Sequence, residues 1–312
     1  MSLLVALSLS LAPAEVEPGP TVWAEAGARP WTLCRDYERQ AESLLQRVSQ
    51  RADEAQAEAP WGPRARECPG APSVLVLAAM RELSKVPSYP PLVDLTAALP
   101  RLAEAQRQTR EQALAWLTQA QVEAQRRGEP PPVLTYYFTA YAALGLGDPE
   151  AARAALARAQ RRGEVESHLL DRAAAVAALL AGELQTALDL AYRARELAPA
   201  SDRQTAVYIL ALIYDRAGAP DAAMRELSAL RPGGFGFERG LVDTLLPLHE
   251  RLYLNALEHK AQRNPNNATR LWEAYLACPE PEAPERTLVE QRLAELRPRG
   301  SVVPTSPGRR GP

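Results

Sequence analysis

The sequence predicts an all-α fold, an αα-hairpin solenoid, on the strength of three observations. Alanine, leucine, arginine and glutamate dominate, whereas phenylalanine occurs only three times in 312 residues, a usage that favours helix over sheet. Gly147, Gly182 and Gly218 recur 35 and 36 residues apart. One alanine precedes each glycine by seven residues and another follows it by five. These alanines are Ala140, Ala175, Ala211, Ala152, Ala187 and Ala223. Small residues at fixed phases of a period of about 34 are typical of stacked helical pairs.

The N-terminus predicts an exported protein. Residues 3–14 form a short apolar run that ends in Ala-Pro-Ala, which fits a signal peptide over residues 1–14 that is cleaved after Ala14, although no basic residue precedes Arg29. The alternative is a frayed or buried apolar segment. The run is shorter than the roughly 20 residues that span a bilayer, so no transmembrane segment is predicted. Residues 15–32 form a linker. We therefore expect a periplasmic or secreted protein, with a cytoplasmic one as the alternative.

Residues 33–85 predict an N-terminal helical hairpin. Its first helix should end before Pro60, a loop with four prolines should cover 59–72, and a second helix should follow. Cys34 begins the first helix and Cys68 precedes the second, which in an exported protein suggests a disulfide. In a reducing cytosol the same residues would be two buried thiols. The remaining cysteine, Cys278, is either a free thiol or part of an intermolecular bridge.

Residues 92–296 predict a helical repeat domain that begins with a helical pair at 92–127 and has its core repeats at 133–232. The core resembles tetratricopeptide repeats (TPRs), whose units of about 34 residues carry small residues at the eighth and twentieth positions. The six alanines named above occupy those positions, and the three glycines end the first helix of each unit. The resemblance implies a TPR-like superhelix with a concave face that binds a peptide or protein.

The resemblance also implies which residues line that groove. They belong to the first helix of each unit: Leu134, Tyr137, Phe138, Tyr141, Arg172, Val176, Tyr208, Ile209 and Leu212. The Lys and Asn residues with which one subclass clamps a terminal carboxylate are missing, so an aromatic and aliphatic surface for an extended or helical peptide is predicted. The alternative is that the chain's own neighbouring helices fill this surface.

After Pro232 the repeat register breaks. A glycine-rich loop at 232–240 leads to a helix at 241–263, which Pro247 should delay or kink. The ending over about forty residues, with Trp272 and Tyr275 at helical spacing, resembles the terminal repeat of exported bacterial TPR proteins of the cell envelope. Residues 297–312 predict a disordered tail.

The sequence shows no constellation of catalytic residues. Each of the three histidines, His168, His249 and His259, lies in helix-forming sequence, and no metal or cofactor is predicted. The net charge of −2 does not indicate the excess of basic residues that is typical of nucleic-acid-binding proteins. We therefore expect a non-catalytic scaffold of the bacterial cell envelope that binds a protein partner. The alternatives are a cytoplasmic TPR adaptor and a cell-wall glycan-binding protein or enzyme.

Overall fold

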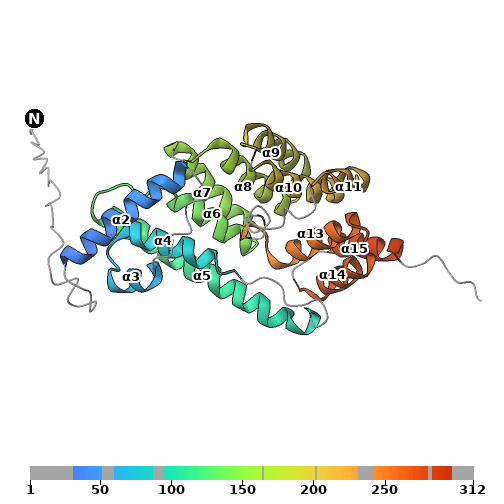
Figure 1. The fold of residues 1–312 in the computed structure, drawn as a ribbon, viewed down its shortest axis with the longest axis horizontal. Helices are drawn as coiled ribbons and strands as arrows, with labels where there is room; N and C mark the ends of the chain where they lie inside the picture. The colour runs from blue at the N-terminus through green and yellow to red at the C-terminus, as the bar shows by residue number, and fades with distance from the viewer. Residues whose placement is uncertain are drawn as a thin grey trace, which may run out of the picture.

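The computed structural model describes residues 31–50, 60–86, 95–163, 165–200, 202–230, 242, 244–279 and 283–296. Across these residues it contains thirteen helices and no strand, which confirms the all-α prediction (Figure 1). The predicted signal peptide (1–14), most of the linker (15–32), the glycine-rich loop (232–240) and the tail (297–312) lie outside the described residues. Within the described part of the chain, no helix combines the length and the apolar character needed to cross a membrane.

Three helices form the N-terminal part: α2 (Trp31–Gln50), α3 (Trp61–Glu67) and α4 (Pro72–Leu83). The predicted disulfide is present, because Cys34 near the start of α2 is bonded to Cys68 directly after α3, with 5.5 Å between their Cα atoms. Helices α2 and α3 both pack on α4 (Figure 1).

Helix α3 corrects the prediction of a continuous loop over residues 59–72. The prolines of this stretch favoured a loop, yet Pro63 falls in the first turn of α3, where a backbone N–H has no partner within the helix. Buried Trp61 and Ala65 anchor the helix to the core.

A single helix, α5 (Leu95–Arg126), replaces the helical pair predicted at 92–127. Apart from Pro100 near its start, the helix contains no proline and no glycine, so nothing in its sequence produces a turn. Its buried residues recur every three or four positions and form one unbroken stripe. They are Leu95, Leu99, Leu102, Gln106, Arg110, Ala113, Leu117, Ala120 and Ala124. Helix α5 packs on α4 and α6 and continues past them to α14.

Three helix pairs follow, as the spacing of glycines and alanines predicts. They are α6 (Thr135–Gly145) with α7 (Pro149–Arg162), α8 (Ser167–Leu180) with α9 (Leu184–Leu197), and α10 (Arg203–Arg216) with α11 (Pro220–Ser228). All six repeat alanines are 0% exposed, so the two helices of each pair approach closely. The intervening glycines have φ values of 77°, 75° and 77°, a left-handed conformation that glycine adopts at low cost.

The hydrogen bonds of the three turns are the same. The N–H of the residue after each glycine donates to a carbonyl five residues earlier: Asp148 to Ala143 at 2.9 Å, Glu183 to Ala178 at 2.9 Å, and Ala219 to Tyr214 at 2.8 Å. This is the six-to-one bond of a Schellman motif, which satisfies a carbonyl at the helix end.

The C-terminal helices are α13 (Leu248–Ala261), α14 (Pro265–Ala277) and α15 (Ala283–Leu296). Helix α13 begins directly after Pro247, so the proline delays the helix and does not kink it. The turn between α13 and α14 repeats the earlier pattern, because the Asn264 N–H donates to the His259 carbonyl at 2.8 Å. Arg263 occupies the glycine position with a φ of 60°.

The alanine spacing recurs in this fourth pair. Ala256 precedes Arg263 by seven residues, Ala268 follows it by five, and both are 0% exposed. The repeat register that was predicted to break after Pro232 therefore resumes at α13. The alanine spacing is the sequence signal for this fourth pair, because Arg263 replaces the glycine.

The C-terminal helices pack against helices from earlier in the chain. Helix α13 contacts α10 and α11, and α14 contacts α5 (Figure 1). Trp272, Tyr253 and Tyr275 are 0% exposed in the core of this C-terminal part. Helices distant in the sequence are thereby brought to the two sides of one cleft.

Candidate functional site

Eight of the nine residues predicted to line a concave groove are buried, and Phe138 is partly buried. Leu134, Tyr137, Tyr141 and Arg172 are each at most 5% exposed, and Val176, Ile209 and Leu212 are 0% exposed. These side chains offer a partner little surface, so the alternative of a surface filled by the chain itself fits their burial better than an open groove does.

The aromatic part of the predicted groove is an internal polar network. Arg172 Nη2 donates to the Tyr141 hydroxyl at 2.7 Å and to the Tyr137 hydroxyl at 3.2 Å, and the two hydroxyls lie 2.6 Å apart. Burial, reinforced by the neighbouring Tyr141, raises the pKa of Tyr137 well above that of a free tyrosine, so the phenol stays neutral. The network ties α6 to α8. Farther along, Tyr208 on α10 donates to Glu258 Oε1 on α13 at 3.5 Å.

A cleft of about 620 Å³ lies elsewhere, between α5 and the C-terminal helices. Its walls are the first half of α5, the turns at 145–147 and 179–182, and the start of α13. Its charged and titratable lining consists of Glu104, Arg107, Arg110, His249, Glu250 and Glu285. The sequence does not predict these residues as a group, because they come from three helices, α5, α13 and α15, that are far apart in the chain.

Arg107 and Glu104 form the open side of this cleft. Their side chains are 53% and 46% exposed and form an ion pair, with Arg107 Nη2 2.8 Å from Glu104 Oε2. Arg107 also contacts Glu111 one turn later. Exposed ion pairs of this kind contribute little to stability, because solvent screens them. They are therefore free to exchange partners with little loss to the fold.

Arg110 closes the floor of the cleft. It is 2% exposed, and its Nη1 donates to the Gly145 carbonyl at 2.6 Å while Nη2 donates to the Leu246 carbonyl at 2.9 Å. A Cβ atom at Gly145 would lie 2.1 Å from Arg110 Nε, so any larger residue here would have to displace this guanidinium. Arg110 thus joins α5, the end of α6 and the segment before α13.

A buried ion-pair network supports the opposite wall. Arg216 Nη2 lies 2.7 Å from Glu250 Oε1, and Nη1 lies 2.9 Å from Glu285 Oε1. The Arg216 guanidinium also lies over the Tyr253 ring, 4.4 Å from its centroid. This stacking and pairing balance the charges that burial would otherwise penalise.

A second ion pair lies beside the first. Arg292 Nη2 is 2.9 Å from Asp215 Oδ1, and the Tyr253 hydroxyl donates to Asp215 Oδ2. Burial and the adjacent Asp215 carboxylate raise the pKa of Tyr253 far above its usual range. The two pairs hold α10, α13 and α15 together.

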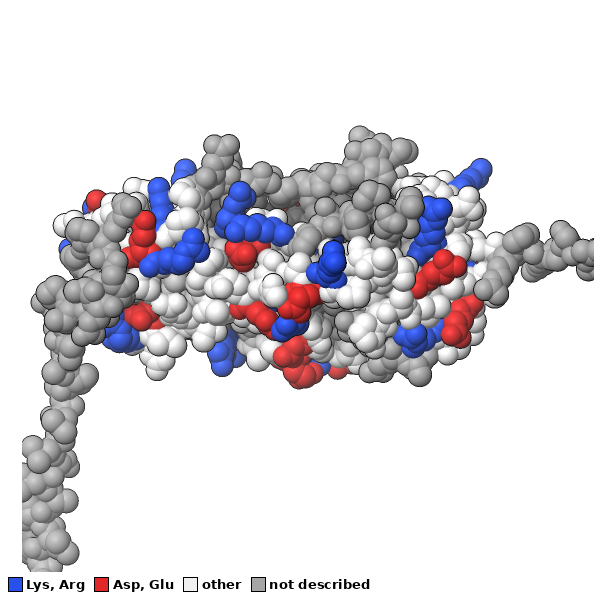
Figure 2. All heavy atoms as spheres, turned by 90° about the horizontal axis from the view of Figure 1, so that it is seen from below, with Lys and Arg blue, Asp and Glu red and all other residues white. Residues whose placement is uncertain are grey.

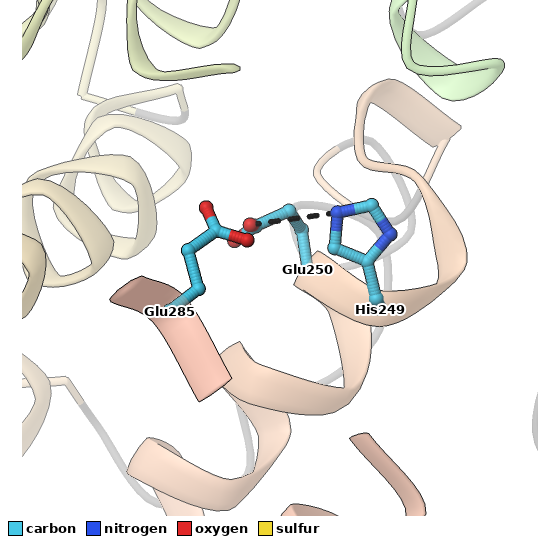
Figure 3. A group of neighbouring side chains, drawn as sticks. All are labelled: His249, Glu250 and Glu285. Atoms are coloured by element: carbon cyan, nitrogen blue, oxygen red, sulfur yellow. Dashed lines mark ion pairs between the residues drawn. The ribbon is translucent and has the colours of Figure 1, made fainter. Parts of the chain in front are cut away.

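His249, Glu250 and Glu285 converge where this network meets the cleft (Figure 3). One potential ligand atom from each residue lies within 4.8 Å of the others, and His249 Nε2 is 3.7 Å from Glu250 Oε1. No metal role was predicted for His249, because Glu285 lies 36 residues farther along the chain and adjacent residues on a helix, such as His249 and Glu250, generally point in different directions. The convergence comes from the packing of α15 beside α13.

No known family model matches this chain, and neither a curated protein nor a solved structure is significantly similar to it. The face shown in Figure 2 carries basic and acidic side chains interspersed, with no large patch of one sign.

Proposed function

We propose that this protein is a TPR-like helical scaffold that binds a protein segment in the cleft between α5 and α13. The TPR-like arrangement is supported by four helix pairs that share one alanine spacing and one left-handed turn, at Gly147, Gly182, Gly218 and Arg263. Stacked helix pairs present extended surfaces and usually act by binding other macromolecules.

The observation that carries the proposal is the contrast between two surfaces. The predicted aromatic groove is buried, whereas the cleft holds about 620 Å³ and keeps Arg107 and Glu104 accessible. A volume in this range accommodates a few residues of a peptide, since ligand clefts typically measure about 300–1,000 Å³. The mixture of charges favours a segment that carries both a carboxylate and a basic group.

An extracytoplasmic location is part of the proposal. The Cys34–Cys68 disulfide supports it, because disulfides persist in oxidising compartments and are rare in a reducing cytosol. The apolar run at residues 3–14 supports it independently. A bacterial cell-envelope scaffold would combine both features.

A charge reversal with a matched control tests the proposal. Arg107→Glu places a carboxylate at the open side of the cleft, whereas Arg126→Glu changes an arginine on the same helix, also in an i,i+3 ion pair, that does not line the cleft. We expect R107E to lose at least about 80% of a stoichiometric partner recovered from the native cell envelope, a loss of roughly 1 kcal/mol or more. R126E should recover it as wild type does. Equal recovery with both variants would refute binding in this cleft.

A further inference from the structure

We propose that His249, Glu250 and Glu285 form a binding site for a divalent first-row metal ion of the Zn²⁺ class at the wall of the cleft. The site offers one imidazole nitrogen and two carboxylates whose ligand atoms lie within 4.8 Å of one another. Zn²⁺ binds this donor set, and three protein ligands leave a further coordination position open. Figure 3 shows the two carboxylates facing each other with the imidazole beside them.

An unsatisfied buried atom points independently to a cation. Glu250 is 2% exposed, and its Oε2 has no hydrogen-bond partner although Oε1 is paired with Arg216. A buried acceptor without a partner destabilises the folded state, and more so when it is charged. A metal ion coordinated by Oε2 would remove this cost without displacing Arg216.

The local charge and access also suit a cation. Arg216 contacts the Oε1 atoms of both carboxylates, and the Tyr275 hydroxyl donates to Glu285 Oε2 at 3.3 Å, so one guanidinium faces two carboxylates. All three residues line the cleft, so an ion and its waters can reach them. Arg110, a buried cation that also lines the cleft, donates to the carbonyls of Gly145 and Leu246.

His168 shows by contrast why the geometry at His249 is distinctive. His168 also lies between two carboxylates, but its Nδ1 faces Glu166 at 3.2 Å and its Nε2 faces Asp202 at 3.2 Å. The two acids therefore lie on opposite sides of the ring and cannot share one ion. His168 thus serves as a matched control for His249.

Calorimetric titration of the full, untagged chain with Zn²⁺ alone tests the site. We expect the protein to bind one equivalent of Zn²⁺. Co²⁺ bound at the same site should give the visible absorption bands that are typical of a low coordination number. His249→Gln and Glu285→Gln should each weaken Zn²⁺ binding at least tenfold while circular dichroism stays unchanged. His168→Gln should bind as wild type does.

Three results would overturn the proposal: no saturable binding to the wild type below 1 mM Zn²⁺, wild-type affinity in both H249Q and E285Q, or equal losses in H168Q and H249Q. A gain in thermal stability on adding Zn²⁺ gives a second readout, because an ion that binds only the folded state stabilises it. That gain should vanish in E285Q. Neither readout depends on a protein partner, so the metal site and the proposed scaffold function can fail separately.

Discussion

Arg110 donates a hydrogen bond to the carbonyl oxygen of Leu246 at 2.9 Å, across 136 residues of sequence. The same guanidinium holds the Gly145 carbonyl, so one buried side chain fixes the relative positions of α5, α6 and α13. The cleft lies among these elements, and its shape therefore depends on Arg110.

Replacing Arg110 should destabilise the fold. Arg110→Met keeps most of the side-chain volume but leaves the Gly145 and Leu246 carbonyls buried without their charged donor, at a cost of about 3 kcal/mol. The measurement is the free energy of unfolding from urea titration. Arg107→Met, one turn earlier and exposed, is the control and should leave the free energy of unfolding nearly unchanged. Equal effects would show that Arg110 does not join these helices.

Replacing Arg263 by glycine should stabilise the protein. Arg263 has a φ of 60°, a left-handed conformation that costs a non-glycine residue about 1–2 kcal/mol. Glycine removes this conformational cost, but its greater entropy in the unfolded chain offsets part of the stabilisation. Arg263→Gly should therefore raise the free energy of unfolding by up to about 1 kcal/mol. Gly182→Ala reverses the change at the equivalent turn and should destabilise by a similar amount. A destabilising R263G would contradict the equivalence of the two turns.

Removing the Cys34–Cys68 disulfide should lower stability. The bond links residues 34 apart. In the chain-entropy model a loop of this size corresponds to about 3–4 kcal/mol. In denaturant unfolding without reductant, the double variant Cys34→Ser/Cys68→Ser should be less stable than the oxidised wild type by this amount. The wild type should show a similar loss when dithiothreitol is added, and the double variant none. A double variant as stable as the oxidised wild type would contradict a stabilising role for the bond.

The stability of the protein should fall at alkaline pH. Burial raises the pKa of Tyr137, and also that of Tyr253 and Tyr275, above the value of about 10 for an unfolded tyrosine. Above that pH the unfolded chain releases these protons while the folded state retains them. The free energy of unfolding therefore keeps this contribution below about pH 10 and loses it progressively as the pH rises further. Urea titrations between pH 8 and 11 would measure the slope. Tyr137→Phe should make the slope shallower, and an unchanged slope would count against a neutral buried Tyr137.

The helix pairs could be predicted because one physical requirement repeats along the chain. Close helix packing needs Ala140 and Ala152 and their equivalents, and a tight turn favours glycine between them. The two helices of the fourth pair were predicted, but their register with the three earlier pairs was not, because Arg263 stands where those pairs have glycine. Ala256 and Ala268 keep the alanine spacing. The extent of α5 was also missed, since a helical pair was expected where no residue forces a turn.

The cleft could not be predicted because it depends on how distant helices pack. Tyr137 and Tyr141 occupy groove positions of the family pattern, but that pattern carries no information on whether this chain buries them with Arg172. Likewise, nothing local to His249 indicates that α15 brings Glu285 beside it. Both features follow from tertiary contacts between segments more than 30 residues apart.

Site-specific photo-crosslinking in the native cell envelope tests the central proposal most directly. A photoreactive amino acid at Arg107 would sit at the open side of the cleft, and one at Val122 would sit on the same helix, 55% exposed and outside the cleft. We predict a discrete crosslinked protein from position 107, lost when the R110M change is added, and no such product from position 122. The same product from both positions, or none from position 107, would contradict a partner-binding cleft.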